Sequence, residues 1–137
     1  MLSEFLTTNT GLPLKPNCRH RINIAALTRK ILQPTRDYYN IAMLILSGFR
    51  STAVNNIVGG SPTSQHLDGA AADFTLAKPE ILWDCFIWIA TNLDFGQLIY
   101  YDNKRFIHVS LGTKKQVFIN SSGVLYPMGK LLGGVNG

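Results

Sequence analysis

The chain has 137 residues, of which 46% are hydrophobic and 15% charged, and this composition excludes a mainly disordered protein. Its length fits one domain spanning residues 1–137. The formal net charge of +5 favours an anionic partner such as nucleic acid, a membrane surface or a bacterial cell wall. Because the basic residues are scattered and form no basic tail, we expect no nucleic-acid partner.

The N-terminal part is predicted to be an irregular arm followed by a helix. Residues 1–21 contain turn-forming Gly and Pro, and they lack the basic flank and sustained apolar stretch of a secretory signal peptide. Behind Asn23, a good N-cap residue, apolar residues recur at helical spacing. The pattern predicts a helix over residues 23–39, with a kink or a new first turn at Pro34.

The middle of the chain combines short strands with one apolar helix. Residues 42–46 are apolar and precede a Ser-Gly pair, which predicts a buried strand with Arg50 just beyond its end. Residues 70–74 are compatible with a second strand of mostly small residues. Pro79 suits a first helical position, and an apolar face predicts a helix from there to about Asn92.

The two cysteines lie in different settings. Cys85 is on the apolar face of the second predicted helix, whereas Cys18 lies in a polar segment that we expect to be a loop. Two cysteines do not make a disulfide framework, so the sequence favours two free thiols, although a single bridge stays open. No apolar stretch of about 18 residues exists, and we therefore expect no membrane span.

The C-terminal part has the pattern of successive strands. Alternating and β-branched residues predict strands at 97–101, 106–111 and 116–120, separated by turn residues, as in an antiparallel meander. Residues 129–137 contain four glycines and predict a mobile tail. Two helices beside a small antiparallel sheet make the predicted fold α+β.

Three side chains in the second half of the chain are good zinc ligands. His66 and Asp73 flank small residues in SQHLDGAAADF, and His108 follows in RFIHVSL, with Ile107 and Val109 predicted to point into the core. A catalytic zinc site uses three such protein ligands and leaves a position for water. On spacing alone, His108 is equally compatible with an ordinary packed or surface histidine.

Three motifs in order resemble the D-alanyl-D-alanine carboxypeptidase family of zinc peptidases, which shares its fold with the Hedgehog signalling domain. SQHLDGAAADF is similar to the family signature S-x-H-x-x-G-x-A-x-D, with every position filled. Upstream, LSGFRSTAVNNIVGGSPTSQH resembles the stretch in phage and bacterial cell-wall members where an Arg follows a strand. Downstream, LIYYDNKRFIHVS resembles the segment that holds the last zinc ligand. The resemblance covers about residues 22–120.

The resemblance implies roles for further residues. Zinc would be held by His66, Asp73 and His108, one ion per chain, while Arg50 and Ser64 would bind a substrate carboxylate. A zinc peptidase also needs a proton acceptor, and Asp102 lies where the Hedgehog segment is acidic.

Each of these roles has a plainer alternative. Asp102 is also a suitable turn residue, Arg50 could pair with a surface carboxylate, and Ser64 could cap a turn. Other family members place the base three residues before the last histidine, where this chain has Arg105. Tyr100 or Tyr101 could line the cleft, although strand packing is the more common role of such residues.

The sequence as a whole predicts a monomeric zinc peptidase that cuts peptidoglycan stem peptides through a metal-activated water. It would be a D-Ala-D-Ala carboxypeptidase or an endolysin-type endopeptidase, made without a signal peptide and acting at the bacterial cell wall, as a phage or prophage product would. The alternative is a binding module for cell wall or protein that retains zinc without hydrolysis, which the Arg105 departure permits. A nucleic-acid partner is a second rival, supported by charge alone.

Overall fold

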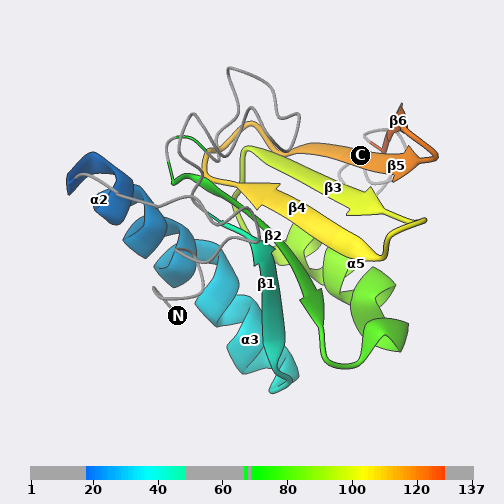
Figure 1. Ribbon diagram of the computed structural model, residues 1–137, viewed down its shortest axis with the longest axis horizontal. Helices are drawn as coiled ribbons and strands as arrows, with labels where there is room; N and C mark the ends of the chain where they lie inside the picture. Colours follow the sequence, from blue (N-terminus) through cyan, green and yellow to red (C-terminus); the bar gives the residue numbers. More distant parts are fainter. Residues whose placement is uncertain (1–17, 49–66, 68, 129–137) are drawn as a thin grey trace, which may run out of the picture.

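A computed structural model describes residues 18–48, 67 and 69–128, which form a six-stranded sheet with helices packed on one face (Figure 1). The α+β fold with two main helical segments is therefore confirmed. No helix in this described part is long and apolar enough to cross a membrane. The helical elements are α2 (Cys18–Leu27), η1 (Thr28–Leu32), α3 (Gln33–Tyr39), η3 (Pro79–Ile81) and α5 (Leu82–Asn92). The strands are β1 (Met43–Ser47), β2 (Ala71–Leu76), β3 (Gln97–Tyr101), β4 (Phe106–Ser110), β5 (Gln116–Ser121) and β6 (Val124–Pro127).

The first helix begins earlier than its sequence pattern indicated. It starts at Cys18, so Asn23 lies inside α2 and is not its cap, and the expected irregular arm is helical over residues 18–21. The apolar pattern starts only at Ile24 because the first turn of α2 is mostly exposed, whereas Ile24 is buried. The rest of the arm, residues 1–17, lies outside the described residues, as does the predicted tail.

Pro34 changes the helix as predicted. Its ring nitrogen carries no hydrogen, so the residue cannot donate a helical hydrogen bond to the turn before it. The preceding residues form the π-helical turn η1, in which the Gln33 N–H donates to the Thr28 carbonyl. Pro34 then occupies the first turn of α3, where the missing donor costs nothing.

The sheet is mixed, and this corrects the predicted meander. The strand order is β1-β2-β4-β3-β5-β6, and all neighbours are antiparallel except β3 and β5, which are parallel. The connection from β4 to β5 crosses the start of β3, where Gly112 lies against Gly96 so closely that an added Cβ would sit 2.9 Å from the Gly96 Cα. The missing side chains at both glycines let the chain cross there, and β6, which was not predicted, completes the edge.

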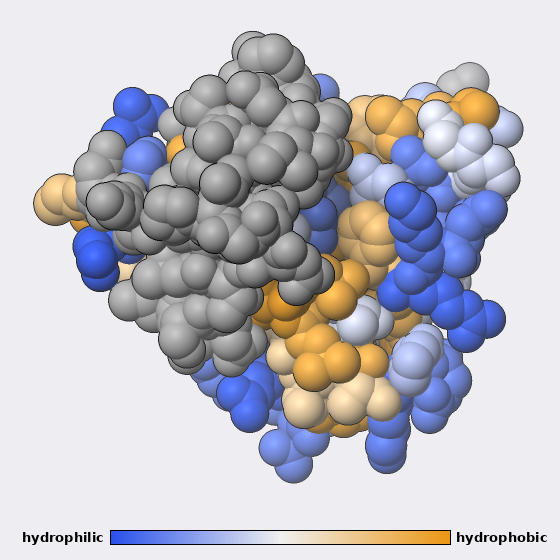
Figure 2. Space-filling model, viewed as in Figure 1, coloured by the Kyte–Doolittle hydropathy of each residue, from blue (hydrophilic) through white to orange (hydrophobic). Residues whose placement is uncertain are grey.

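One sheet face forms the core. The other face, which no described helix covers and which we call the open face, carries the polar groups discussed below. Phe74, Ile107, Val109 and Leu98 are fully buried and belong to one cluster with residues of α2, η1 and α5. The predicted apolar face of α5 is confirmed. Strand β1 was predicted to be buried, but it is an edge strand and only partly buried. Met43 is buried, whereas Leu44 and Leu46 are 50% and 57% exposed. Figure 2 shows hydrophobic surface gathered over this part of the sheet.

The cysteines are free, as predicted, with Cys18 exposed at the start of α2 and Cys85 buried in the core. Burial raises the pKa of the Cys85 thiol to about 12, with a smaller contribution from the charge of Asp84. The thiol therefore stays protonated at neutral pH and is a poor metal ligand. Asp84 also accepts a hydrogen bond of 2.5 Å from the Tyr39 hydroxyl, which links α3 to α5.

Candidate metal centre

Antiparallel pairing of β2 with β4 brings Asp73 and His108 together. The two residues are direct cross-strand partners, although 35 positions separate them in the chain. The Nδ1 atom of His108 lies 2.8 Å from the Oδ1 atom of Asp73, and each side chain is 14% exposed. An imidazole nitrogen and a carboxylate oxygen thus converge at one point that solvent still reaches.

The neighbouring strands favour this arrangement. His108 on β4 has one cross-strand partner on each side: Ile99 on β3 and Asp73 on β2. The side chain of Ile99 is apolar, so Asp73 is the polar partner. Ile107 and Val109, on either side of His108, are fully buried in the core, as predicted from strand alternation. A shift of one residue in register would bury the imidazole and expose two core residues, so packing fixes the position of His108.

Gly69 sets the path by which the chain enters β2. Its φ of +72° lies in the left-handed region, and a Cβ added there would lie 2.8 Å from the His20 carbonyl oxygen of α2. The following small residues, Ala71 and Ala72, are fully buried. A glycine at position 69 therefore has a physical basis here, because it combines a left-handed φ with a close approach to α2.

The pair fits zinc in its donor chemistry. Zinc accepts imidazole nitrogen and carboxylate oxygen at about 2.0–2.2 Å, which sets two tetrahedral donors roughly 3.3 Å apart. The observed 2.8 Å between Nδ1 and Oδ1 is a hydrogen-bond distance, so the two atoms would have to separate by about half an ångström to hold the metal. Among the described residues no group of three His, Cys, Asp or Glu side chains could hold a metal. The third predicted ligand, His66, lies outside the described residues, together with Arg50 and Ser64.

Asp102 is not brought next to His108 by the strands. It is exposed in the turn between β3 and β4, and its backbone N–H donates to the Asn120 carbonyl at 3.2 Å. His108 is opposite Ile99, and Asp102 follows Ile99 by three residues. At about 3.3 Å per residue this is roughly 10 Å along the strand. To act near Asp73 and His108, the Asp102 carboxylate would have to reach back over the open face.

Two aromatic residues beside the pair were not recognised as partners from the sequence. The rings of Tyr101 and Phe106 stack with centroids 4.3 Å apart and an angle of 12° between their planes. Phe106 shares its strand face with His108, and Tyr101 is its direct cross-strand partner. Tyr100, the other candidate for the cleft, lies on the core side against Trp83 and Phe86. The hairpin register across residues 102–105 could have identified the stacked pair.

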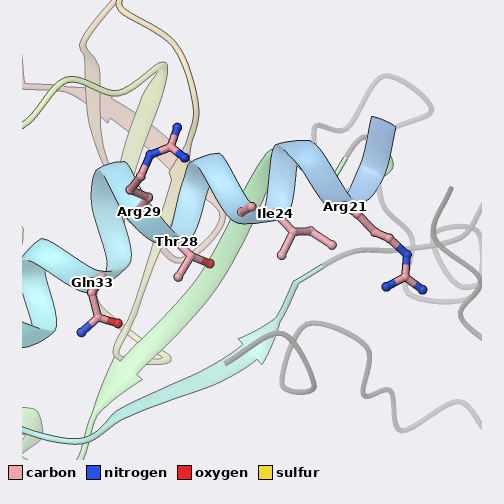
Figure 3. A pocket seen from close by; sticks show the side chains of 6 residues that line it. Arg21, Ile24, Thr28, Arg29 and Gln33 are labelled. Carbon is pink, nitrogen blue, oxygen red and sulfur yellow. The ribbon is translucent and has the colours of Figure 1, made fainter. Parts of the chain in front are cut away.

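A separate cavity of about 510 Å³ lies along the first helix. Figure 3 shows Ile24, Thr28 and Gln33 projecting into it from the same side of the helix. Its lining residues also include Arg21, Ala25 and Arg29, and none of the six is an acidic residue or a histidine. The described lining of the cavity therefore lacks metal-ligating side chains, and the Asp73–His108 pair is the better candidate for a catalytic site.

Comparison with known protein families gives one match. A family model described as Peptidase M15 matches residues 4–110, which cover most of the chain and include every residue proposed above for the site. No curated protein matches the chain.

The role of Gly69 can be tested by comparing two substitutions to Ala in a protein kept free of metal with chelator. Gly123, in the turn before β6, also has a positive φ of +86° but no atom within 4 Å of an added Cβ. Gly123→Ala should cost about 1–2 kcal/mol of unfolding free energy, from backbone strain alone. Gly69→Ala should cost clearly more, because its Cβ also meets the His20 backbone. Equal losses in urea unfolding would show that the contact with α2 is unimportant.

Proposed function

Because the chain belongs to the Peptidase M15 family, whose members are zinc-dependent peptidases, we propose that it hydrolyses the stem peptides of peptidoglycan. The observation that carries the proposal is the convergence of His108 Nδ1 and Asp73 Oδ1 at 2.8 Å on the open face of the sheet. A carboxylate and an imidazole placed together across two strands, within reach of solvent, suit a metal centre better than a packed core.

The proposed ligands are His66, Asp73 and His108, with one zinc ion per chain. Bound zinc would supply a Lewis acid that polarises the peptide carbonyl and lowers the pKa of a water to about 7. Asp73 and His108 would exchange their mutual hydrogen bond for metal ligation, which requires Nδ1 to carry no proton. Metal affinity should therefore fall as the pH is lowered, because protons compete with the metal for its ligands.

Asp102 is the proposed general base, which accepts a proton from the attacking water. Of the described carboxylates other than Asp73, it alone lies on the hairpin that carries His108, whereas Asp37, Glu80 and Asp84 belong to the helical segments. If Asp102 is not the base, Asp94 and Asp68 are the next carboxylates to test.

Arg50 and Ser64 are proposed to bind a carboxylate of the substrate. A guanidinium fork holds a carboxylate through two parallel hydrogen bonds, and a hydroxyl adds a third donor. This arrangement suits a terminal D-alanine, which a carboxypeptidase would remove, and it also suits an acidic group within the stem peptide, as an endolysin-type endopeptidase would meet. The net charge of +5 would favour association with an anionic cell wall.

The chief alternative is a zinc-binding module without hydrolytic activity. It is favoured by two observations, the position of Asp102 beyond the end of β3 and the presence of Arg105 where other members have their base. Arg105 adopts a left-handed φ of +55° at the end of the turn, so the turn itself is well formed without an acidic residue there. The peptidase and the binding module would both hold zinc, and they differ only in whether a bound peptide is hydrolysed.

Metal content tests the ligand set. The purified protein should contain about one zinc per chain, and replacing His66, Asp73 or His108 by Ala should remove most of it, since two ligands hold zinc far less tightly than three. His20→Ala serves as the matched control and should keep its zinc. Elemental analysis after gel filtration gives the answer, and full zinc retention in His108→Ala would rule out the proposed centre.

Digestion of purified peptidoglycan, followed by mass analysis of the fragments, tests the activity. The zinc-loaded protein should release D-alanine or cut stem peptides. Asp102→Asn should keep its zinc and lose roughly 10² to 10⁴-fold in rate, because general-base catalysis contributes an amount of that order. Absence of any new fragment with the parental protein favours the binding module. A parental rate in Asp102→Asn makes Asp102 a turn residue only.

A further inference from the structure

Two neighbouring rows of side chains on the open face of the sheet contain the proposed metal ligands and the residues beside them. Cross-strand pairing places five side chains in the row that contains the ligands: Ser47, Asp73, His108, Ile99 and Phe118. The adjacent row on the same face, nearer the turn, contains Phe106, Tyr101 and Asn120. Adjacent rows on one face are two residues apart, or about 7 Å.

The stacked rings of Tyr101 and Phe106 lie outside the hydrophobic core. Among the described residues, neither ring belongs to the buried core cluster or packs against it, whereas the neighbouring Tyr100 does. Both rings are half-buried, and they present apolar surface on the face that carries His108. Large apolar side chains usually pack into the core, so an aromatic pair placed beside polar metal ligands suggests contact with a ligand.

The turn that follows the rings has its own hydrogen bonds. The Arg105 N–H donates to the Tyr101 carbonyl at 2.8 Å, the Asp102 N–H donates to Asn120, and the Asn103 side chain donates to the Ser122 hydroxyl at 3.1 Å. These contacts involve the backbone or the neighbouring β5–β6 turn. The hairpin is thus held by these hydrogen bonds as well as by the stacking of the two rings.

We propose that Tyr101 and Phe106 form the wall of a substrate subsite, which receives an aliphatic side chain two residues from the scissile carbonyl. The inference rests on the proposed peptidase function. An extended peptide advances about 3.3 Å per residue, so a chain whose carbonyl lies at Asp73 and His108 places its second residue about 7 Å away, at the height of the rings. The wall would make the protein prefer an aliphatic residue over Gly at that position.

The test is the binding of paired peptides to the zinc-loaded full chain. One peptide is a pentapeptide stem, and its partners carry Gly in place of one aliphatic residue at a time. In the parental protein, one Gly replacement should weaken binding roughly 10-fold, as expected for a few methyl or methylene groups in an apolar subsite. Phe106→Ala should reduce this ratio to near one while zinc content stays unchanged, and Phe106→Leu should restore part of it.

A matched control removes another stacked aromatic ring, far from the open face. Tyr38 is 62% exposed and stacks on Trp88 with centroids 4.5 Å apart, so Tyr38→Ala should leave the ratio unchanged. If Phe106→Ala weakens all peptides equally, the ring has only a structural role and the proposal fails. The proposal also fails if only Phe106→Leu can be purified and this variant keeps the parental ratio of peptide affinities. It fails as well if the parental protein binds no peptide. Discrimination without product release would instead retain the subsite and refute the proposed hydrolysis.

Discussion

The cross-strand contact between Asp73 and His108 is the interaction on which the candidate site depends. It exists because β2 and β4 pair in one particular register, and that register is fixed by packing on the opposite face, where Phe74, Ile107 and Val109 are fully buried. The hydrophobic core therefore sets the positions of the two proposed ligands from the opposite face of the sheet. A chain that lost this packing would also lose the 2.8 Å approach of nitrogen to oxygen.

The division of the sheet into two faces explains how so small a chain can carry chemistry. Described helices cover one face and supply the core, whereas Asp73 and His108 lie on the face that no described helix covers. Gly69 connects the two layers, because its backbone lies against α2 on one side and leads into β2 on the other. The family match over residues 4–110 gives this arrangement its chemical meaning as a zinc peptidase.

Local patterns predicted most of the elements, but not the pairings between distant ones. Strand alternation correctly predicted that His108 and its neighbours Ile107 and Val109 point to opposite faces of the sheet. Pro79 correctly predicted the start of the second helical segment. Both signals act within a few residues. The parallel pairing of β5 with β3 was missed, since a short loop usually implies a hairpin and the Gly96–Gly112 crossing is not a local signal. The sequence motif named Asp73 and His108, whereas their contact across 35 residues became visible only in the fold.

X-ray absorption at the zinc edge tests the central claim most directly, because it reports the atoms bound to the metal in the intact protein. Only nitrogen and oxygen neighbours at about 2.0–2.2 Å are expected, with the imidazole signature of two histidines. His108→Ala should bind little zinc, and the zinc that remains should show one imidazole fewer. Sulfur neighbours at about 2.3 Å would contradict it, because they would assign the metal to cysteine. An unchanged spectrum in His108→Ala would contradict it as well.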